Sequence, residues 1–105
     1  MRRTMEERLT DNEFDPQDLA EACGVSKRYV HSVFARAGTT FGRELIELRL
    51  RRARQLLSNP RFRSWSISQI ALECGFSDQS HFSRRFRKRF DAAPSSCREL
   101  VETAP

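Results

Sequence analysis

Lysines, paired cysteines and long apolar runs are scarce or missing in this sequence. No apolar run approaches the length that crosses a membrane, and the N-terminal segment MRRTMEERLTDNEF lacks the apolar core of an export signal. We therefore expect no membrane partner and a cytoplasmic location.

Cysteine and histidine occur without the spacings that bind metals. Cys23, Cys74 and Cys97 are far apart and odd in number, and no Cys-x-x-Cys pair is present. His31 and His81 each lack a second ligand at helical spacing. We expect the cysteines to be small buried residues in a reducing compartment, and we expect no metal site and no disulfide scaffold.

The residue groupings that catalysis requires are also missing. The sequence contains no nucleophile paired with a base, no glycine-rich phosphate loop and no ligand cluster. At 105 residues the chain can bury one modest core or two very small ones. We expect no enzyme activity, no catalytic residue and no cofactor.

Arginine, in contrast, is abundant. The formal net charge is +5, and because Lys27 and Lys88 are the only lysines, nearly all of the positive charge is arginine. The guanidinium group forms forked hydrogen bonds with phosphates and with the edge of guanine. This balance favours a nucleic-acid partner.

The chain contains a similar phrase twice, first as AEACGVSKRYVHSVF and later as ALECGFSDQSHFSRRF. An offset of 51 residues pairs Gly24 with Gly75, and beyond the glycine the register slips by one, so that Val30 pairs with Phe82. Each copy has the turn glycine and apolar spacing of a helix-turn-helix, whose second helix presents its outer face to the DNA major groove. Two copies in one short basic chain are far more specific than one.

Helix start signals support both copies. Asp15 and Pro16 place a capping residue and a proline at the start of one helix, and Ser66 with Gln69 forms a capping box at the start of another. We expect the second helix of each copy to be capped by Ser26 or Ser77.

Between the copies lies the segment TTFGRELIELRLRRARQLLSNP, whose apolar arc is wider than one docked helix face needs. It predicts a connecting helix from about Thr40 to Leu57 that packs against both copies. We predict an all-α fold of about seven helices, with one helix-turn-helix subdomain over 1–39, the connecting helix over 40–58 and a second subdomain over 59–105. Such a helix spans roughly 27 Å, comparable to one turn of DNA at about 34 Å.

The residues of the second copy carry a family resemblance. Ile70-Ala71, the run from Cys74 to Phe86 and Pro94 resemble the DNA-binding domain of AraC/XylS-type transcription regulators. The resemblance implies that the chain is either a small stand-alone regulator or a fragment of a longer one, because the family's domain usually follows an effector-binding or dimerisation domain. Asp91, Cys97 and Arg85 depart from the family pattern, which usually has glycine, tyrosine and a small or apolar residue there.

Outward positions of the two second helices are candidates to contact DNA. From the side-chain types and helical spacing, and equally from the resemblance, we expect base reading by Arg28, His31, Ser32, Gln79, Ser80, Ser83 and Arg84. We expect phosphate contacts from Ser26, Arg36, Ser66, Ser77, Arg87, Lys88 and Arg89. For any single arginine the alternative is a solvated surface charge. We expect Arg49, within the apolar arc of the connecting helix, to pair with a carboxylate or with carbonyl groups.

These patterns predict a transcription regulator that binds double-stranded DNA sequence-specifically, with two recognition helices in successive major grooves. The alternative is a protein-interaction module that contacts RNA polymerase or a partner regulator through acidic outer residues such as Glu44 and Glu47. RNA polymerase is an expected partner in either case. An interaction module alone would not need two outward sets of arginine, glutamine and serine after matched turns.

Overall fold

The computed structural model describes the backbone of residues 1–102 and the side chains of residues 1–98. Within residues 1–102 the fold has seven α-helices and no strand, which confirms the all-α prediction. The last residues of the second predicted subdomain, 103–105, lie outside the described part. The helices are α1 (Arg2–Arg8), α2 (Pro16–Cys23), α3 (Lys27–Arg36), α4 (Phe41–Leu57), α5 (Ile67–Glu73), α6 (Gln79–Phe90) and α7 (Pro94–Glu102), with a short 3₁₀ turn, η1 (Pro60–Phe62), before α5.

Capping side chains set the starts of three helices, and the sequence predicts the caps of α2 and α5. The Asp15 carboxylate accepts a hydrogen bond from the Asp18 amide and opens α2, and Thr40 does the same for α4 through the Arg43 amide. At α5 the Ser66 hydroxyl accepts from the Gln69 amide at 3.0 Å, while the Ser66 amide donates to Gln69 Oε1 at 2.7 Å. Each cap satisfies a backbone donor that the helix itself leaves unpaired.

Helix α1 has no counterpart among the predicted helix starts, although the sequence contains ion-pair and apolar spacings typical of a helix. Arg2 pairs with Glu6 at 3.4 Å, one helical turn away, and Arg3 pairs in the same way with Glu7. Met5 and Leu9 repeat at the same spacing and are both buried in the first core. The helix is therefore held mainly by its apolar side, because exposed ion pairs of this kind contribute little.

The apolar side chains form two separate cores that meet on α4. Phe41, Leu45 and Leu48 belong to the first core, together with residues of α1, α2 and α3. From Leu50 onward the buried residues of α4 belong to the second core, which contains residues of α5 and α6. The connecting helix thus packs against both helix-turn-helix units, as its wide apolar arc predicts.

Arg49, at the point where α4 changes core, holds the segment after α1 against α4. Its Nε donates to the Leu9 carbonyl at 2.7 Å and its Nη2 donates to the Asp11 carbonyl at 2.8 Å. Partial burial lowers the pKa of Arg49, and the nearby Asp11 carboxylate opposes that effect. The predicted pairing with carbonyl groups is confirmed, and it joins the segment after α1 to the connecting helix.

The last helix packs on the second core despite two departures from the family pattern. Asp91 takes the left-handed conformation usually left to glycine, with φ of 56°, and ends α6. Half-buried Cys97 packs against the second core. Arg98 donates to the carbonyls of Phe62 and Trp65, which ties α7 to the segment before α5.

Candidate nucleic-acid interface

The two helix-turn-helix units share one turn geometry. After α2 the Val25 amide donates to the Ala20 carbonyl at 3.0 Å, and after α5 the Phe76 amide donates to the Ala71 carbonyl at the same distance. The glycine before each of these amides has a positive φ, 67° at Gly24 and 93° at Gly75. The repeat in the sequence is therefore a repeat of backbone structure.

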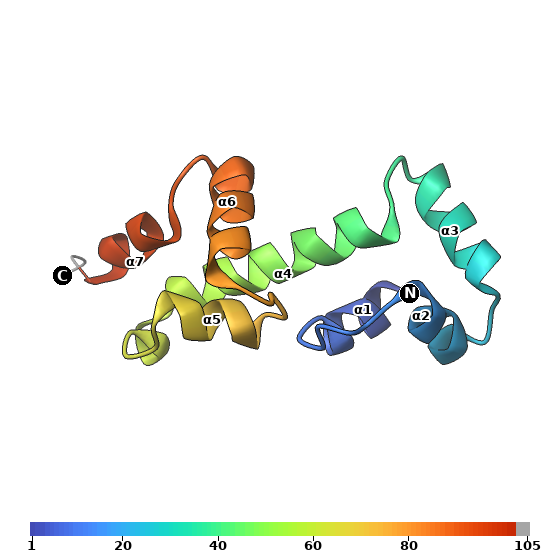
Figure 1. Cartoon of the computed structure of the whole chain (residues 1–105), viewed down its shortest axis with the longest axis horizontal. Coiled ribbons are helices and arrows are strands. Elements are labelled where there is room, and N and C mark those ends of the chain that lie inside the picture. Colours follow the sequence, from blue (N-terminus) through green and yellow to red (C-terminus); the bar gives the residue numbers. More distant parts are fainter. Residues whose placement is uncertain (103–105) are drawn as a thin grey trace.

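The second helix of each unit, α3 and α6, stands on the same side of the connecting helix. In Figure 1 α6 rises above α4, and α3 stands beyond the first residues of α4 with its C-terminal end also above that helix, while α1, α2 and α5 lie below. The molecule is elongated, with extents of 49 × 24 × 22 Å, and α3 and α6 are separated along its long axis. The two helices therefore stand apart on one side of α4.

On α3 the predicted base readers lie on the face away from the core. Val30 and Phe34 are buried, which leaves Arg28 and His31 exposed to solvent. Ser32 is half-buried, and its hydroxyl accepts a hydrogen bond from Arg36 Nη2 at 3.3 Å. The structure therefore couples one predicted base reader to one predicted phosphate contact.

On α6 the predicted set is again on the outer face. Phe82 and Phe86 are fully buried and anchor the helix in the second core. The Gln79, Ser80 and Arg84 side chains are exposed, and that of Ser83 is half-buried. Because these two phenylalanines hold one side of α6 against the core, the polar side chains on its other side face outward.

The start of α6 differs from the prediction. The sequence predicts a cap at Ser77, but the helix begins one residue later and its cap is Asp78, whose Oδ1 accepts a hydrogen bond from the His81 amide at 2.7 Å. The one-residue slip between the two copies explains the difference, because it aligns Ser26 with Asp78 rather than with Ser77. Ser26 caps α3 as predicted, with its hydroxyl accepting from the Tyr29 amide at 3.0 Å.

The cationic side chains at the end of α6 differ in their surroundings, because two are exposed to solvent and one is paired with α4. Arg87 and Lys88 are exposed and form no ion pair among the residues whose side chains are described. Arg89, predicted to contact phosphate, is instead paired with Glu47 of α4 at 2.7 Å, and its Nε donates to both carboxylate oxygens at 2.8 Å. The hydrogen bond from Arg89 lowers the pKa of Glu47, and the same pairing raises the pKa of Arg89.

This ion pair also corrects the rival interpretation of Glu47 as a free acidic outer residue. Glu47 receives a second pairing from Arg51 at 3.1 Å, and only 21% of its side chain is exposed. Its charge is thus neutralised within the molecule. Of the two acidic residues named for an interaction surface, only Glu44 forms no ion pair among the described side chains.

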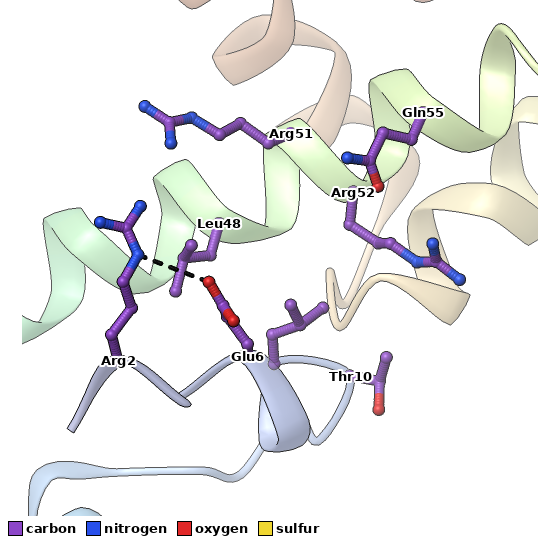
Figure 2. Close-up of a pocket in the computed structure, with 8 residues that line it drawn as sticks. Arg2, Glu6, Thr10, Leu48, Arg51, Arg52 and Gln55 are labelled. Carbon is purple, nitrogen blue, oxygen red and sulfur yellow. Dashed lines mark ion pairs between the residues drawn. The ribbon is translucent and has the colours of Figure 1, made fainter. Parts of the chain in front are cut away.

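Elsewhere on the molecule, a cleft of about 590 Å³ lies between α1 and α4. Figure 2 shows the ion pair between Arg2 and Glu6 on one wall of the cleft, and the side chains of Arg52 and Gln55 on the other wall. Helix α1, which forms one wall of the cleft, lies on the side of α4 opposite to α6 (Figure 1). Within the described part of the chain, no cluster of three or more potential metal ligands occurs, and no helix is long and apolar enough to span a membrane.

Known proteins share this architecture. A family model described as a helix-turn-helix domain matches residues 19–100. A solved transcriptional regulator of Chromobacterium violaceum, described as an AraC-type DNA-binding domain-containing protein, is 36% identical, with a TM-score of 0.85 over 98% of this chain and 89% of that one. The chain belongs to the AraC/XylS-type helix-turn-helix family.

Curated relatives of this AraC/XylS-type chain include transcriptional activators. The transcriptional activator RhrA of Rhizobium meliloti is 39% identical over 100 residues, which cover 95% of this chain and 32% of that protein. The activator RhaS of Escherichia coli is 40% identical over 82 residues, or 77% of this chain and 28% of that protein. The chain therefore spans about a third of the length of the curated relatives that it matches.

One structural relative of the AraC/XylS-type chain was solved with nucleic acid. It is the DNA-binding domain of AdpA in complex with a target DNA, which is 25% identical and has a TM-score of 0.80 over 95% of this chain and 87% of that one. The resemblance stated from the sequence is confirmed at the level of family and fold. The family is one of transcription regulators with DNA-binding domains, which agrees with the expectation of no enzyme activity.

Proposed function

We propose that this chain binds double-stranded DNA sequence-specifically and regulates transcription by inserting α3 and α6 into successive major grooves. The observation that carries the proposal is the common orientation of the two helices, both on one side of α4 (Figure 1). A duplex turns once in about 34 Å, so two helices that contact successive major grooves of one face must point the same way.

The length of the connecting helix supports simultaneous binding by one subunit. The 17 residues of α4 span roughly 26 Å at about 1.5 Å per residue. Both cores pack against this one helix, so the spacing between the two units is held by apolar burial rather than by a flexible linker. A fixed spacing lowers the cost of ordering the second contact once the first has formed.

Base reading is assigned to the outer faces of the two helices. Arg28 and Arg84 can each form a forked contact with guanine, and Gln79 suits adenine. His31, Ser32, Ser80 and Ser83 complete the proposed set with single hydrogen bonds to bases or nearby phosphates. Because Ser32 is bonded to Arg36, we expect these two side chains to contact DNA together.

Phosphate contacts are assigned to residues at helix starts and to cationic residues of α3 and α6. The proposed set is Ser26, Arg36, Ser66, Ser77, Arg87 and Lys88. Arg89 would have to leave Glu47 before it could bind a phosphate, so we omit it from the set that acts without rearrangement. Contacts of this kind position the protein on the duplex and carry no sequence information themselves.

The partners of a longer parent protein are part of the same proposal. The curated relatives are about three times longer than their matched segment, which supports an effector-binding or dimerisation domain joined to this one. Their description as activators supports contact with RNA polymerase, for which Glu44 remains a candidate. Binding to chromosomal DNA would place the protein in the cytoplasm.

Selection of bound duplexes from a random library tests the proposed function. We expect a bipartite consensus whose two parts lie about 10 base pairs apart, because α3 and α6 would enter grooves one turn apart. A gel shift at low salt with random duplexes separates this proposal from the interaction module. Failure to shift any duplex would reject DNA binding, and a single short consensus would reject the two-groove mechanism.

A further inference from the structure

A second basic feature is a groove between α4 and α6, separate from the outer faces proposed to read bases. The groove has a volume of about 290 Å³ and is bounded by the first half of α4 and the last half of α6. Ile46 and Leu50 form its apolar part. Its charged lining residues are Arg43, Glu47, Arg85, Lys88 and Arg89.

The lining has a net positive charge that is not neutralised from within. It carries four cations and one carboxylate, a formal charge of +3. Glu47 is engaged by Arg89, and this pair leaves Arg43, Arg85 and Lys88 without an ion-pair partner among the described side chains. Arg85 makes one hydrogen bond, from its Nε to His81 Nε2 at 3.3 Å, which orients the side chain without cancelling its charge.

The groove lies where a duplex contacted by both helices would pass. The part of α4 that carries Arg43, Ile46 and Leu50 runs between α3 and α6 in Figure 1. Lys88 follows Arg84 by one helical turn, so the groove adjoins the proposed base-reading face of α6. The opposite face of α4, with Leu48, Arg52 and Gln55, turns toward α1 instead (Figure 2).

We propose that Arg43, Arg85 and Lys88 form a phosphate-binding groove that holds the DNA backbone between the two half-sites, where the duplex presents its minor groove to α4. The charge of the three cations complements the phosphodiesters, and the partly exposed Ile46 offers an apolar surface to the deoxyribose carbons. Lys88 already belongs to the proposed phosphate set, whereas Arg43 and Arg85 are new. This inference rests on the proposed function, because it requires both recognition helices to bind one duplex.

Salt dependence of binding tests the groove through its charge. Each phosphate neutralised contributes about 0.9 to the slope of log affinity against log salt. The Arg43→Gln/Arg85→Gln/Lys88→Gln variant is expected to lower that slope by about 2 to 3 and to weaken binding on all sequences alike. The probe is the duplex selected by the wild-type chain from the random library.

A matched variant removes the same number of charges elsewhere. Arg52 lies on the opposite face of α4, and Arg61 and Arg63 are exposed at the 3₁₀ turn before α5. The Arg52→Gln/Arg61→Gln/Arg63→Gln variant therefore reproduces any effect of net charge without touching the groove. We expect it to keep most of the wild-type salt slope.

Neutral phosphates in the DNA locate the contact without relying on a folded variant. Methylphosphonates placed between the half-sites are expected to weaken binding by the wild-type chain, and methylphosphonates outside the site are not. The groove variant is expected to lose this sensitivity, because its partner charges are gone. The single Arg43→Gln variant serves if the triple variant does not fold.

The outcomes separate this inference from the proposed function. Equal slopes for the groove variant and its matched control, or no effect of the central methylphosphonates on the wild-type chain, would overturn the groove while leaving the two-groove function standing. No binding of any duplex by the wild-type chain would overturn both. A reduced slope together with lost methylphosphonate sensitivity supports the groove.

Discussion

The turn after α2 and the turn after α5 have the same backbone hydrogen bond but different surroundings. A Cβ atom built on Gly24 meets no atom within 4 Å, whereas one built on Gly75 would lie 2.5 Å from the Leu9 carbonyl oxygen and 2.7 Å from Arg49 Nε. The first turn needs glycine only for its backbone conformation. The second needs it also because another part of the chain occupies the space.

Packing around the two turns differs in the same direction. Cys74 and Phe76 of the second turn are buried, while their counterparts Cys23 and Val25 are half-buried. The second turn lies against the segment that Arg49 holds, so it serves as a joint between the two units as well as a turn within one. A repeated motif can therefore have a structural role in one of its copies only.

The largest difference between the copies is expected for their glycines. Gly75→Ala combines a positive φ with a collision against backbone, and we expect it to lower the free energy of unfolding by about 3 kcal/mol. Gly24→Ala has only the conformational penalty and should cost about 1 kcal/mol. Chemical denaturation of the two variants measures both values. Equal losses would mean that the contact with Leu9 does not constrain the second turn.

The two recognition helices are expected to contribute similar amounts to different halves of the DNA site. Arg28→Ala and Arg84→Ala should each cost about 1 to 3 kcal/mol of binding free energy and relax preference at one base pair. Binding to a panel of single-base variants of the selected duplex locates each effect. Losses spread over every position, or both falling in the same half-site, would contradict the assignment of α3 and α6 to separate grooves.

Local signals in the sequence were sufficient to predict most of the fold. The cap at Ser66 depends on a residue three positions away, and the burial of Phe82 and Phe86 follows from helical spacing, so each needs only a short window. The predicted role of Arg49 was also right, because a charge inside an apolar arc must find a polar partner.

What the sequence did not reveal depends on how separate elements meet. Glu47 and Arg89 are 42 residues apart, and their pairing requires the placement of α6 on α4. Arg43 lines the groove for the same reason, although a signal was available in its position one turn before Glu47. The cap at Asp78 was missed because the slip between the copies begins just at the helix start.

The buried Cys74 thiol of the second turn makes the stability of the fold depend on pH. Burial raises the pKa of Cys74 from 9.0 to about 12, so the unfolded chain ionises this thiol at a lower pH than the folded chain does. The contribution of the protonated Cys74 thiol to the free energy of unfolding is therefore complete below pH 9.0 and is lost as pH rises toward about 12. At one pH unit above 9.0 the free energy of unfolding is lower by about 1.4 kcal/mol. Urea unfolding across this range measures the loss.

Two alanine variants serve as controls for that pH dependence. Cys74→Ala should flatten the fall in stability above pH 9.0, although it lowers stability overall by leaving a small cavity. Cys23→Ala keeps Cys74 and should still show the fall. An unchanged slope in the Cys74 variant would assign the pH dependence to other groups.

The smallest expected difference concerns the caps of the two recognition helices. Ser26→Ala and Asp78→Ala each remove the side chain that accepts from a first-turn amide, and each should cost about 1 kcal/mol of stability. Ser77→Ala should change stability by less than about 0.5 kcal/mol, because its exposed side chain does not cap the helix. Asp78→Asn should retain most of the cap, since asparagine accepts the same hydrogen bond without a charge. Denaturation midpoints of the four variants show which residue caps α6. A larger loss of stability for Ser77→Ala than for Asp78→Ala would favour the cap predicted from the sequence.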